Sequence, residues 1–235
     1  MMRSVPLLLR LFIACAAMLV LTSCSGQSVT RILFIGNSYT FINDGIDAHL
    51  VKLKSSVRPE RVVGGGYTLQ KHWETGTALR NIRSGGWAYV VLQEQSQTPV
   101  FDPAKFRQFV REFDREIKLK GAKTVLLMTW ERPDSVKSGV TTANLAAAAR
   151  AAGAELGIKV APVGLAFEQS LRERPDLALY VADGHPTLYG TFLASCVLFG
   201  TIFDRSPVGI TQADTRIPPD LRDYFERVAA RTLGY

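Results

Sequence analysis

A serine, a histidine and an aspartate in this chain have the chemistry of a nucleophilic site. Ser38 follows the apolar run of residues 32–35 and a glycine at which a tight turn can begin. An activated serine needs a base, and that base needs a carboxylate to orient it. The loop segment Asp183-Gly184-His185 offers both, just ahead of an apolar stretch. We therefore predict Ser38 as a nucleophile, His185 as its base and Asp183 as the orienting acid.

Two further segments carry groups suited to a developing oxyanion. Residues 62–69 run from a short apolar strand into three glycines, ending at Gly66, and glycine lets a backbone N–H approach a ligand. Residues 89–96 form another apolar strand that ends in amides, and Gln95 is placed there to donate to an oxyanion. The structural alternatives are a flexible turn for the glycines and hydrogen bonds to loop backbone for Gln93 and Gln95. Neither G-x-G-x-x-G nor a Walker lysine follows the glycines, which argues against a nucleotide site.

Ser38 also has a purely structural interpretation. Asn37 and Ser38 are residues that cap helices, and for an isolated Gly-Asn-Ser turn capping would be the better explanation. Capping does not account for the other three segments. The two remaining histidines offer no second base, because His49 and His72 lie in helical patterns among polar neighbours, where we expect them at the surface.

The four segments resemble, in order and spacing, the conserved blocks of the SGNH (GDSL-type) hydrolase superfamily. Ser38 matches the nucleophile of the first block, Gly66 the oxyanion glycine of the second, and Gln95 the position of the oxyanion asparagine in the third. Asp183 and His185 match the acid and base of the fifth block, although a single residue separates them here and two is usual. The resemblance covers roughly residues 30–210 and implies that the N–H groups of Ser38 and Gly66 and the amide of Gln95 receive the oxyanion.

The resemblance implies a serine hydrolase that cleaves carboxylic esters through an acyl-enzyme. Water completes deacylation, so no cofactor is expected, and no ligand spacing of a structural zinc site is present in the sequence. By this resemblance, acetyl or other short acyl esters of carbohydrates are the favoured substrates, ahead of lipid esters or thioesters. The alternative is a catalytically silent, glycan-binding envelope protein that keeps the hydrolase fold, which the Gln95 replacement and the short Asp183-to-His185 spacing favour. The presence of Ser38 and His185 together argues against that alternative.

The elements that must position these residues alternate between strands and helices. Strands are predicted over residues 31–35, 61–63, 89–92, 124–128 and 159–161, and helices over 103–120, 142–156, 188–203 and 217–233. Strands joined by helical crossovers give a parallel sheet with helices on both faces, a three-layer α/β/α sandwich. Five strands with the nucleophile after the first favour a flavodoxin-like order, which the resemblance also implies, and ligands bind at the carboxyl ends of such strands. Trp130, after the fourth strand, is either a wall of the site or a core residue, and Tyr39 is another possible wall.

The amino-terminal segment is typical of a bacterial lipoprotein signal. An apolar run over residues 11–21 follows two arginines, and Leu21-Thr22-Ser23-Cys24 resembles a lipobox. We expect a signal peptide over residues 1–23, a tether over 24–29 that begins at an acylated Cys24, and the hydrolase domain over 30–235. The alternative is an ordinary signal peptide cut at small residues. The residue after the cysteine is Ser25 and not aspartate, as in lipoproteins that are sent to the outer membrane. We therefore expect a location in the cell envelope, at the outer membrane or facing the periplasm.

Charge and cysteine content restrict the partners. The chain has 28 Lys and Arg against 21 Asp and Glu, a formal net charge of +7, but the basic residues are mixed with acids along helices. That pattern indicates solvated helix faces and no nucleic-acid partner. The expected partners are a small-molecule or carbohydrate ester and, through the lipid anchor, the membrane. Cys196 lies in an apolar run and is expected to be buried, with no second cysteine for a disulfide once Cys15 leaves with the signal and Cys24 is acylated.

Overall fold

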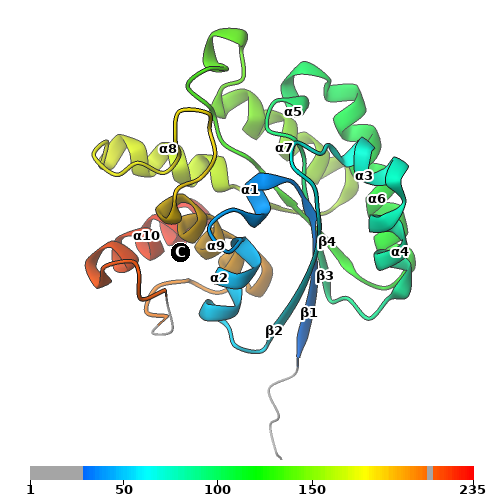
Figure 1. Ribbon diagram of the computed structural model, residues 1–235, viewed down its shortest axis with the longest axis horizontal. Coiled ribbons are helices and arrows are strands. Elements are labelled where there is room, and N and C mark those ends of the chain that lie inside the picture. Colours follow the sequence, from blue (N-terminus) through cyan, green and yellow to red (C-terminus); the bar gives the residue numbers. More distant parts are fainter. Residues whose placement is uncertain (1–28, 211–213) are drawn as a thin grey trace, which may run out of the picture.

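A single parallel sheet organises the part of the chain that the computed structural model describes, residues 29–210 and 214–235. The predicted signal peptide, Cys24 and most of the tether lie outside the described residues. The five strands are β1 (Thr30–Gly36), β2 (Val57–Val63), β3 (Tyr89–Gln93), β4 (Lys123–Leu127) and β5 (Lys159–Ala161). All neighbouring pairs are parallel and the order is β2-β1-β3-β4-β5 (Figure 1). This is the predicted flavodoxin-like order.

Helices cover both faces of the sheet, so the predicted three-layer sandwich is confirmed (Figure 1). One layer contains α2 (Ile46–Leu53), α8 (Val163–Glu173), α9 (Leu188–Phe203) and α10 (Pro219–Leu233). The other contains α3 (Leu69–Thr75), α4 (Thr77–Ser84), α6 (Pro103–Leu119) and α7 (Thr142–Leu156). Two short helices, α1 (Ser38–Phe41) and α5 (Thr98–Phe101), begin soon after the carboxyl ends of β1 and β3, and a 3₁₀ turn spans Val136–Ser138.

The interior strand β1 divides its side chains between two cores. Ile32 and Phe34 pack with the layer of α2, α8, α9 and α10, whereas Leu33 and Ile35 pack with the layer of α3, α4, α6 and α7. Successive residues of a strand point to opposite faces, so an unbroken apolar run is what a strand covered on both sides requires. The expected burial of Cys196 is confirmed, since it lies fully buried in α9.

The observed elements differ from the predicted ones chiefly at β2, α4 and α8. β2 begins at Val57, four residues before the predicted start, and includes Pro59 and charged residues. It is an edge strand that pairs with β1 alone, and an edge position tolerates both proline and exposed charge. Neither α4 nor α8 is among the predicted helices. Among the described residues, no helix is both long and apolar enough to cross a membrane.

The predicted surface position of two histidines is wrong. His49 and His72 are each 1 % exposed, because they lie on the faces of α2 and α3 that pack inward. Each ring has one hydrogen-bond partner that makes burial tolerable: His49 Nε2 lies 3.0 Å from the Asn43 carbonyl oxygen, and His72 Nε2 lies 2.8 Å from that of Gly36. Burial lowers the pKa of both imidazoles.

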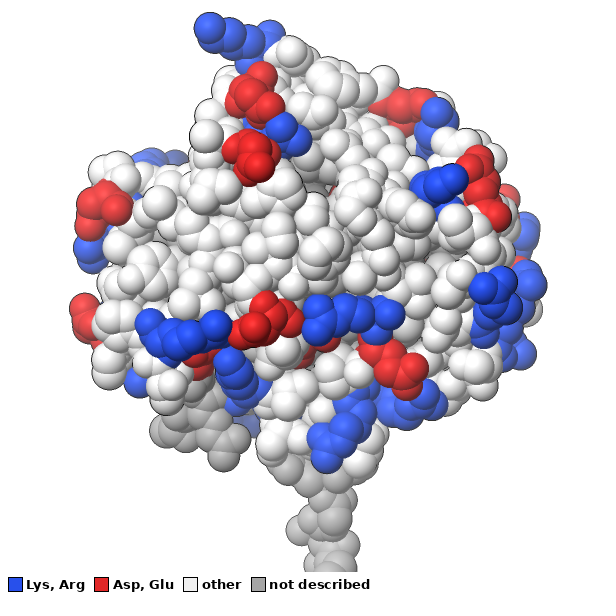
Figure 2. Space-filling view, in the orientation of Figure 1, with Lys and Arg blue, Asp and Glu red and all other residues white. Residues whose placement is uncertain are grey.

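Charged side chains are interspersed over the face shown in Figure 2, with basic and acidic groups next to one another. Several are paired across elements, for example Arg83 of α4 with Glu116 of α6 at 2.8 Å, and Arg231 of α10 with Glu173 of α8 at 2.7 Å. Exposed pairs of this kind contribute little to stability individually. They indicate solvated helix faces, in line with the charge pattern of the sequence.

Candidate active site

The nucleophile turn lies where β1 meets α1. Asn37 is the N-cap of α1, and its Oδ1 accepts the N–H of Tyr39 at 3.1 Å. Capping is therefore the right description of Asn37, as the structural interpretation holds. Ser38 is the first residue of the helix, and its Oγ lies 2.9 Å from Nε2 of His185. The two interpretations apply to neighbouring residues, and the turn that caps α1 also presents the hydroxyl.

Asp183 reaches His185 with both carboxylate oxygens. Oδ2 lies 3.0 Å from Nδ1 of His185, and Oδ1 accepts the backbone N–H of the same residue at 3.1 Å. The second contact is an Asx-type turn, which spans two residues and therefore explains why a single intervening residue suffices. That residue, Gly184, has φ of 84°, and a Cβ there would approach the Tyr39 hydroxyl within 2.6 Å. The two donors of His185 lower the pKa of Asp183, which keeps the carboxylate ionised beside the imidazole.

The loop that carries His185 is held by Trp130. The indole Nε1 donates to the Gly184 carbonyl at 3.0 Å, and the ring stacks between Tyr39 at 4.5 Å and Phe167 at 4.4 Å. Trp130 is 1 % exposed and therefore packs in the core, and it also lines a second pocket on the side away from Ser38 that is described below. Its effect on the site is indirect, because it supports the base from behind.

The predicted oxyanion residues line the same pocket as the nucleophile. This pocket, which we call the catalytic pocket because the predicted nucleophile and base line it, has a volume of about 150 Å³, and it is lined by Asn37, Ser38, Tyr39, Gly66, Gln95, Ser96, Arg132 and His185. Within the described chain, the N–H groups of Ser38 and Gly66 donate to no protein acceptor. Gln95 Oε1 accepts the backbone N–H groups of Gln97 at 2.8 Å and Thr98 at 3.1 Å, so its amide nitrogen is the end left for a ligand. Asp183 lies outside the pocket wall, with 65 % of its side chain exposed.

A buried amide supports the nucleophile turn, and its contacts agree with the structural alternative, in which Gln93 bonds loop backbone. Gln93, 1 % exposed, accepts the N–H of Asn37 and the hydroxyl of Thr40, both at 2.9 Å, through Oε1. A Cβ on Gly36 would lie 2.6 Å from that oxygen, so glycine is needed for this close approach. His72 Nε2 donates to the Gly36 carbonyl at 2.8 Å. No sequence signal distinguishes Gln93 from any other amide at a strand end.

Asn37 links the nucleophile turn to the loop that carries Gly66, and this link is testable. Its Nδ2 donates to the Tyr67 carbonyl at 3.0 Å, a bond that an aspartate cannot make. Asn37→Asp keeps the cap on Tyr39 but sets a carboxylate oxygen against a carbonyl. We expect a loss of about 1–3 kcal/mol in unfolding free energy and a fall of about tenfold in turnover of an aryl ester.

The matched control is Asn81→Asp, where Nδ2 also donates to a backbone carbonyl, that of Thr77 at 3.0 Å, on the exposed helix α4. Denaturant unfolding and steady-state kinetics of both variants are the measurements. Equal effects at positions 37 and 81 would contradict a role for the Asn37 link in the site.

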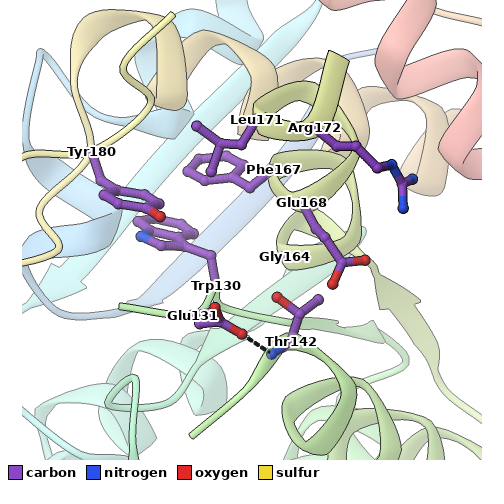
Figure 3. A pocket seen from close by; sticks show the side chains of 9 residues that line it. All are labelled: Trp130, Glu131, Thr142, Gly164, Phe167, Glu168, Leu171, Arg172 and Tyr180. Atoms are coloured by element: carbon purple, nitrogen blue, oxygen red, sulfur yellow. Dashed lines mark hydrogen bonds between the residues drawn. The ribbon is translucent and has the colours of Figure 1, made fainter. Parts of the chain in front are cut away.

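A second, larger pocket lies behind Trp130. It has a volume of about 300 Å³, between the loop after β4 and helix α8 (Figure 3). Its lining combines apolar and polar groups: Trp130, Glu131, Thr142, Gly164, Phe167, Glu168, Leu171, Arg172 and Tyr180. Glu131 accepts the Thr142 N–H at 2.8 Å, which fixes one wall (Figure 3). Tyr180 belongs to the His185 loop, since it forms an antiparallel bridge with Pro186, so this pocket adjoins the catalytic loop.

Comparisons with known proteins agree with this fold. No family model and no curated protein matches the chain. A solved structure from Slackia heliotrinireducens, described as an SGNH hydrolase, is 30 % identical with a TM-score of 0.66 and covers 74 % of this chain and 100 % of its own. A DUF4886 family protein from Bacteroides uniformis has a TM-score of 0.72 at 15 % identity over 88 % and 96 % of the two chains. An acetyl-xylooligosaccharide esterase from Geobacillus has a TM-score of 0.59 at 16 % identity over 74 % and 94 %. Because the Slackia heliotrinireducens relative is 30 % identical and is covered along its whole length, this chain belongs to the SGNH hydrolase family.

Proposed function

We propose that the protein is a serine esterase that hydrolyses carboxylic esters through an acyl-enzyme intermediate. The observation that carries the proposal is the continuous contact from Ser38 Oγ through His185 to Asp183, with distances of 2.9 and 3.0 Å. Such an arrangement activates a serine hydroxyl by removing its proton as it attacks. The chain itself supplies every group that this activation of Ser38 uses.

The reaction follows from these positions. Ser38 Oγ attacks the ester carbonyl while His185 Nε2 takes its proton, and Asp183 holds the tautomer with the proton on Nδ1. The oxyanion is received by the N–H groups of Ser38 and Gly66 and by the amide nitrogen of Gln95. His185 then returns its proton to the leaving alcohol. Water, deprotonated by the same imidazole, attacks the acyl-enzyme and releases the acid.

The substrate we propose is a short acyl ester, in particular an acetyl ester, of a carbohydrate. The catalytic pocket of about 150 Å³ leaves little room beyond a small acyl group. The second pocket, at about 300 Å³, is at the low end of small-molecule sites and suits a single ring. Its carboxylates, hydroxyls and guanidinium can bond sugar hydroxyls, while Tyr180 and Leu171 provide an apolar wall. The acetyl-xylooligosaccharide esterase among the structural neighbours acts on a substrate of this kind.

Covalent labelling separates this function from a silent glycan-binding protein. A fluorophosphonate probe is expected to modify wild-type protein at Ser38, and a panel of acetylated sugars is expected to release acetate. A protein that binds glycans without labelling or acetate release would contradict the esterase proposal.

For the substrate, Tyr180→Ala is expected to raise KM for acetylated oligosaccharides several-fold and to leave KM for a small aryl acetate unchanged. Tyr235→Ala, at an exposed position, is the control.

We further propose that the protein is a lipoprotein of the cell envelope, anchored through Cys24. Protein from bacterial cells is then expected to enter the detergent phase, with an acylated Cys24 at its mature amino terminus. Cys24→Ala is expected to abolish lipidation, because alanine has no thiol to acylate. The variant is also expected to leave the membrane, because stable anchoring requires several acyl chains. Mass spectrometry of the mature terminus is the measurement. An unmodified terminus at another residue would contradict the anchor and leave the esterase proposal intact.

A further inference from the structure

A buried carboxylate joins the two loops that carry the proposed oxyanion donors Gly66 and Gln95. Glu94 directly follows β3 and is 2 % exposed. Its Oε1 accepts the N–H of Gln95 at 2.7 Å and that of Leu69 at 3.1 Å. Leu69 begins α3, three residues after Gly66. One oxygen thus connects the Gly66 loop to the Gln95 loop.

This link completes a set of bonds around the catalytic pocket. Asn37 ties the nucleophile turn to the Gly66 loop through the Tyr67 carbonyl, and Gln93 ties β3 to the same turn through the Asn37 N–H. Glu94 supplies the remaining side, between the two loops that approach the oxyanion. An oxyanion hole acts through donors that are already in place, and small displacements of such donors weaken it strongly.

The surroundings of Glu94 are poorly suited to a charge. The groups that line the small cavity beside it are neutral: Pro99, Phe106, Leu126, Leu127, Met128, Thr129, Leu145 and Ala149. The charge that acts on Glu94 is Lys105 of α6, which itself pairs with Asp102 at 3.0 Å. Burial raises the pKa of Glu94 to about 7, against the two backbone donors and Lys105, which lower it. A carboxyl that is costly to ionise here is better explained by function than by stability.

We propose that Glu94 is a positioning residue that holds the Gly66 and Gln95 donors at the distance the oxyanion requires. The inference rests on the proposed esterase function. It differs from a role in catalysis itself, because Glu94 does not line the catalytic pocket and contacts no reacting atom. It also predicts an unusual pairing of effects, in which loss of the carboxylate slows turnover without loss of stability.

Two variants separate positioning from stability. Glu94→Leu fits the apolar cavity and removes the acceptor, so kcat for an aryl acetate is expected to fall about 100-fold with KM within about threefold. Glu94→Gln keeps an acceptor oxygen, and Thr129, whose buried Oγ1 has no partner among the described residues, lines the same cavity and can accept from the new amide. The kcat of Glu94→Gln is expected to fall no more than about tenfold. At pH 8 the melting temperature of Glu94→Gln is expected to equal or exceed that of wild type. That of Glu94→Leu is expected to lie near the wild-type value, because removing a carboxyl that is costly to ionise offsets the two N–H groups left without an acceptor.

The pH dependence provides a second readout. The folded-state pKa of Glu94 lies above its unfolded value, so the folded protein binds the extra proton and stability falls as pH rises from about 4.5 to about 7. Glu94→Gln is expected to remove this fall, so its melting temperature gains on wild type between pH 5 and pH 8. A carboxylate accepts N–H bonds more strongly than a carboxylic acid. The kcat of wild type is therefore expected to decrease more steeply than that of Glu94→Gln from pH 8 to pH 6.

Glu226 provides the matched control. It is also 2 % exposed, its pKa is also raised by burial, and it accepts the N–H of Gly209 at 2.9 Å, but it lies on α10 in the other helical layer. Glu226→Gln is expected to leave kcat unchanged. The inference is overturned if Glu94→Leu turns over within twofold of wild type, or if its kcat falls only in step with its melting temperature. If wild type itself neither turns over esters nor reacts with a fluorophosphonate, the esterase proposal fails and the inference with it.

Discussion

Ser38→Ala is expected to lower kcat for a short-chain aryl ester by more than about 10⁴-fold, with the protein still folded. The hydroxyl is needed for attack on the carbonyl, whereas the turn itself is held by Asn37 and Gln93, which this change leaves in place. The residual rate, from an oxyanion hole and binding alone, should remain above that in water. Steady-state kinetics and circular dichroism of the purified variant are the measurements.

Two controls make this result decisive. The same variant should lose all covalent labelling by a fluorophosphonate, since the labelled atom is gone. Ser195→Ala removes a buried hydroxyl that donates to the Thr191 carbonyl at 2.8 Å inside α9, and it should keep wild-type turnover. Wild-type rates in Ser38→Ala would end the serine-esterase proposal.

His185→Ala is expected to be as damaging as Ser38→Ala, because the nucleophile loses its base. Asp183→Asn is expected to cost less, about 10- to 100-fold in kcat, since the imidazole remains but its tautomer is poorly held. The side chain of Asp183 is 65 % exposed, and solvent screens its charge. Its Oδ1 contact with the His185 N–H also keeps the turn in shape after the substitution.

The pattern across variants decides between a triad and a dyad. If Asp183→Asn turns over at the wild-type rate, Ser38 and His185 act as a dyad oriented by another group. The matched control is Asp176→Asn, an exposed aspartate paired with Arg174 at 2.7 Å, which should not alter kcat. A wild-type rate in His185→Ala would contradict the assignment of the base.

The sequence by itself determined the features that depend on neighbours in the chain. Apolar runs such as residues 32–35 predicted strands buried on both faces, and the helical pattern over residues 142–156 predicted α7 with the bounds that the structure shows. The Asp183-to-His185 contact is also local, because an aspartate two residues before an N–H bends the chain by its own hydrogen bond. The resemblance of four short blocks then placed Ser38, Gly66 and Gln95 after strands that end at one edge of the sheet, and His185 in a loop ahead of a helix. Errors arose where a local pattern was weak, as in the charged, proline-containing edge strand β2.

Only the tertiary structure decided which of these residues meet and what supports them. Ser38 and His185 are 147 residues apart, and their 2.9 Å contact depends on the strand order and on the packing of α9. His49 and His72 were expected at the surface but lie buried, because helix orientation against the sheet is set by packing across layers. Gln93, Glu94 and Trp130 resemble ordinary residues at strand ends until their partners on other elements are known. Hydrogen bonds between distant segments form when strands pair and helices dock, and no spacing along the chain records them.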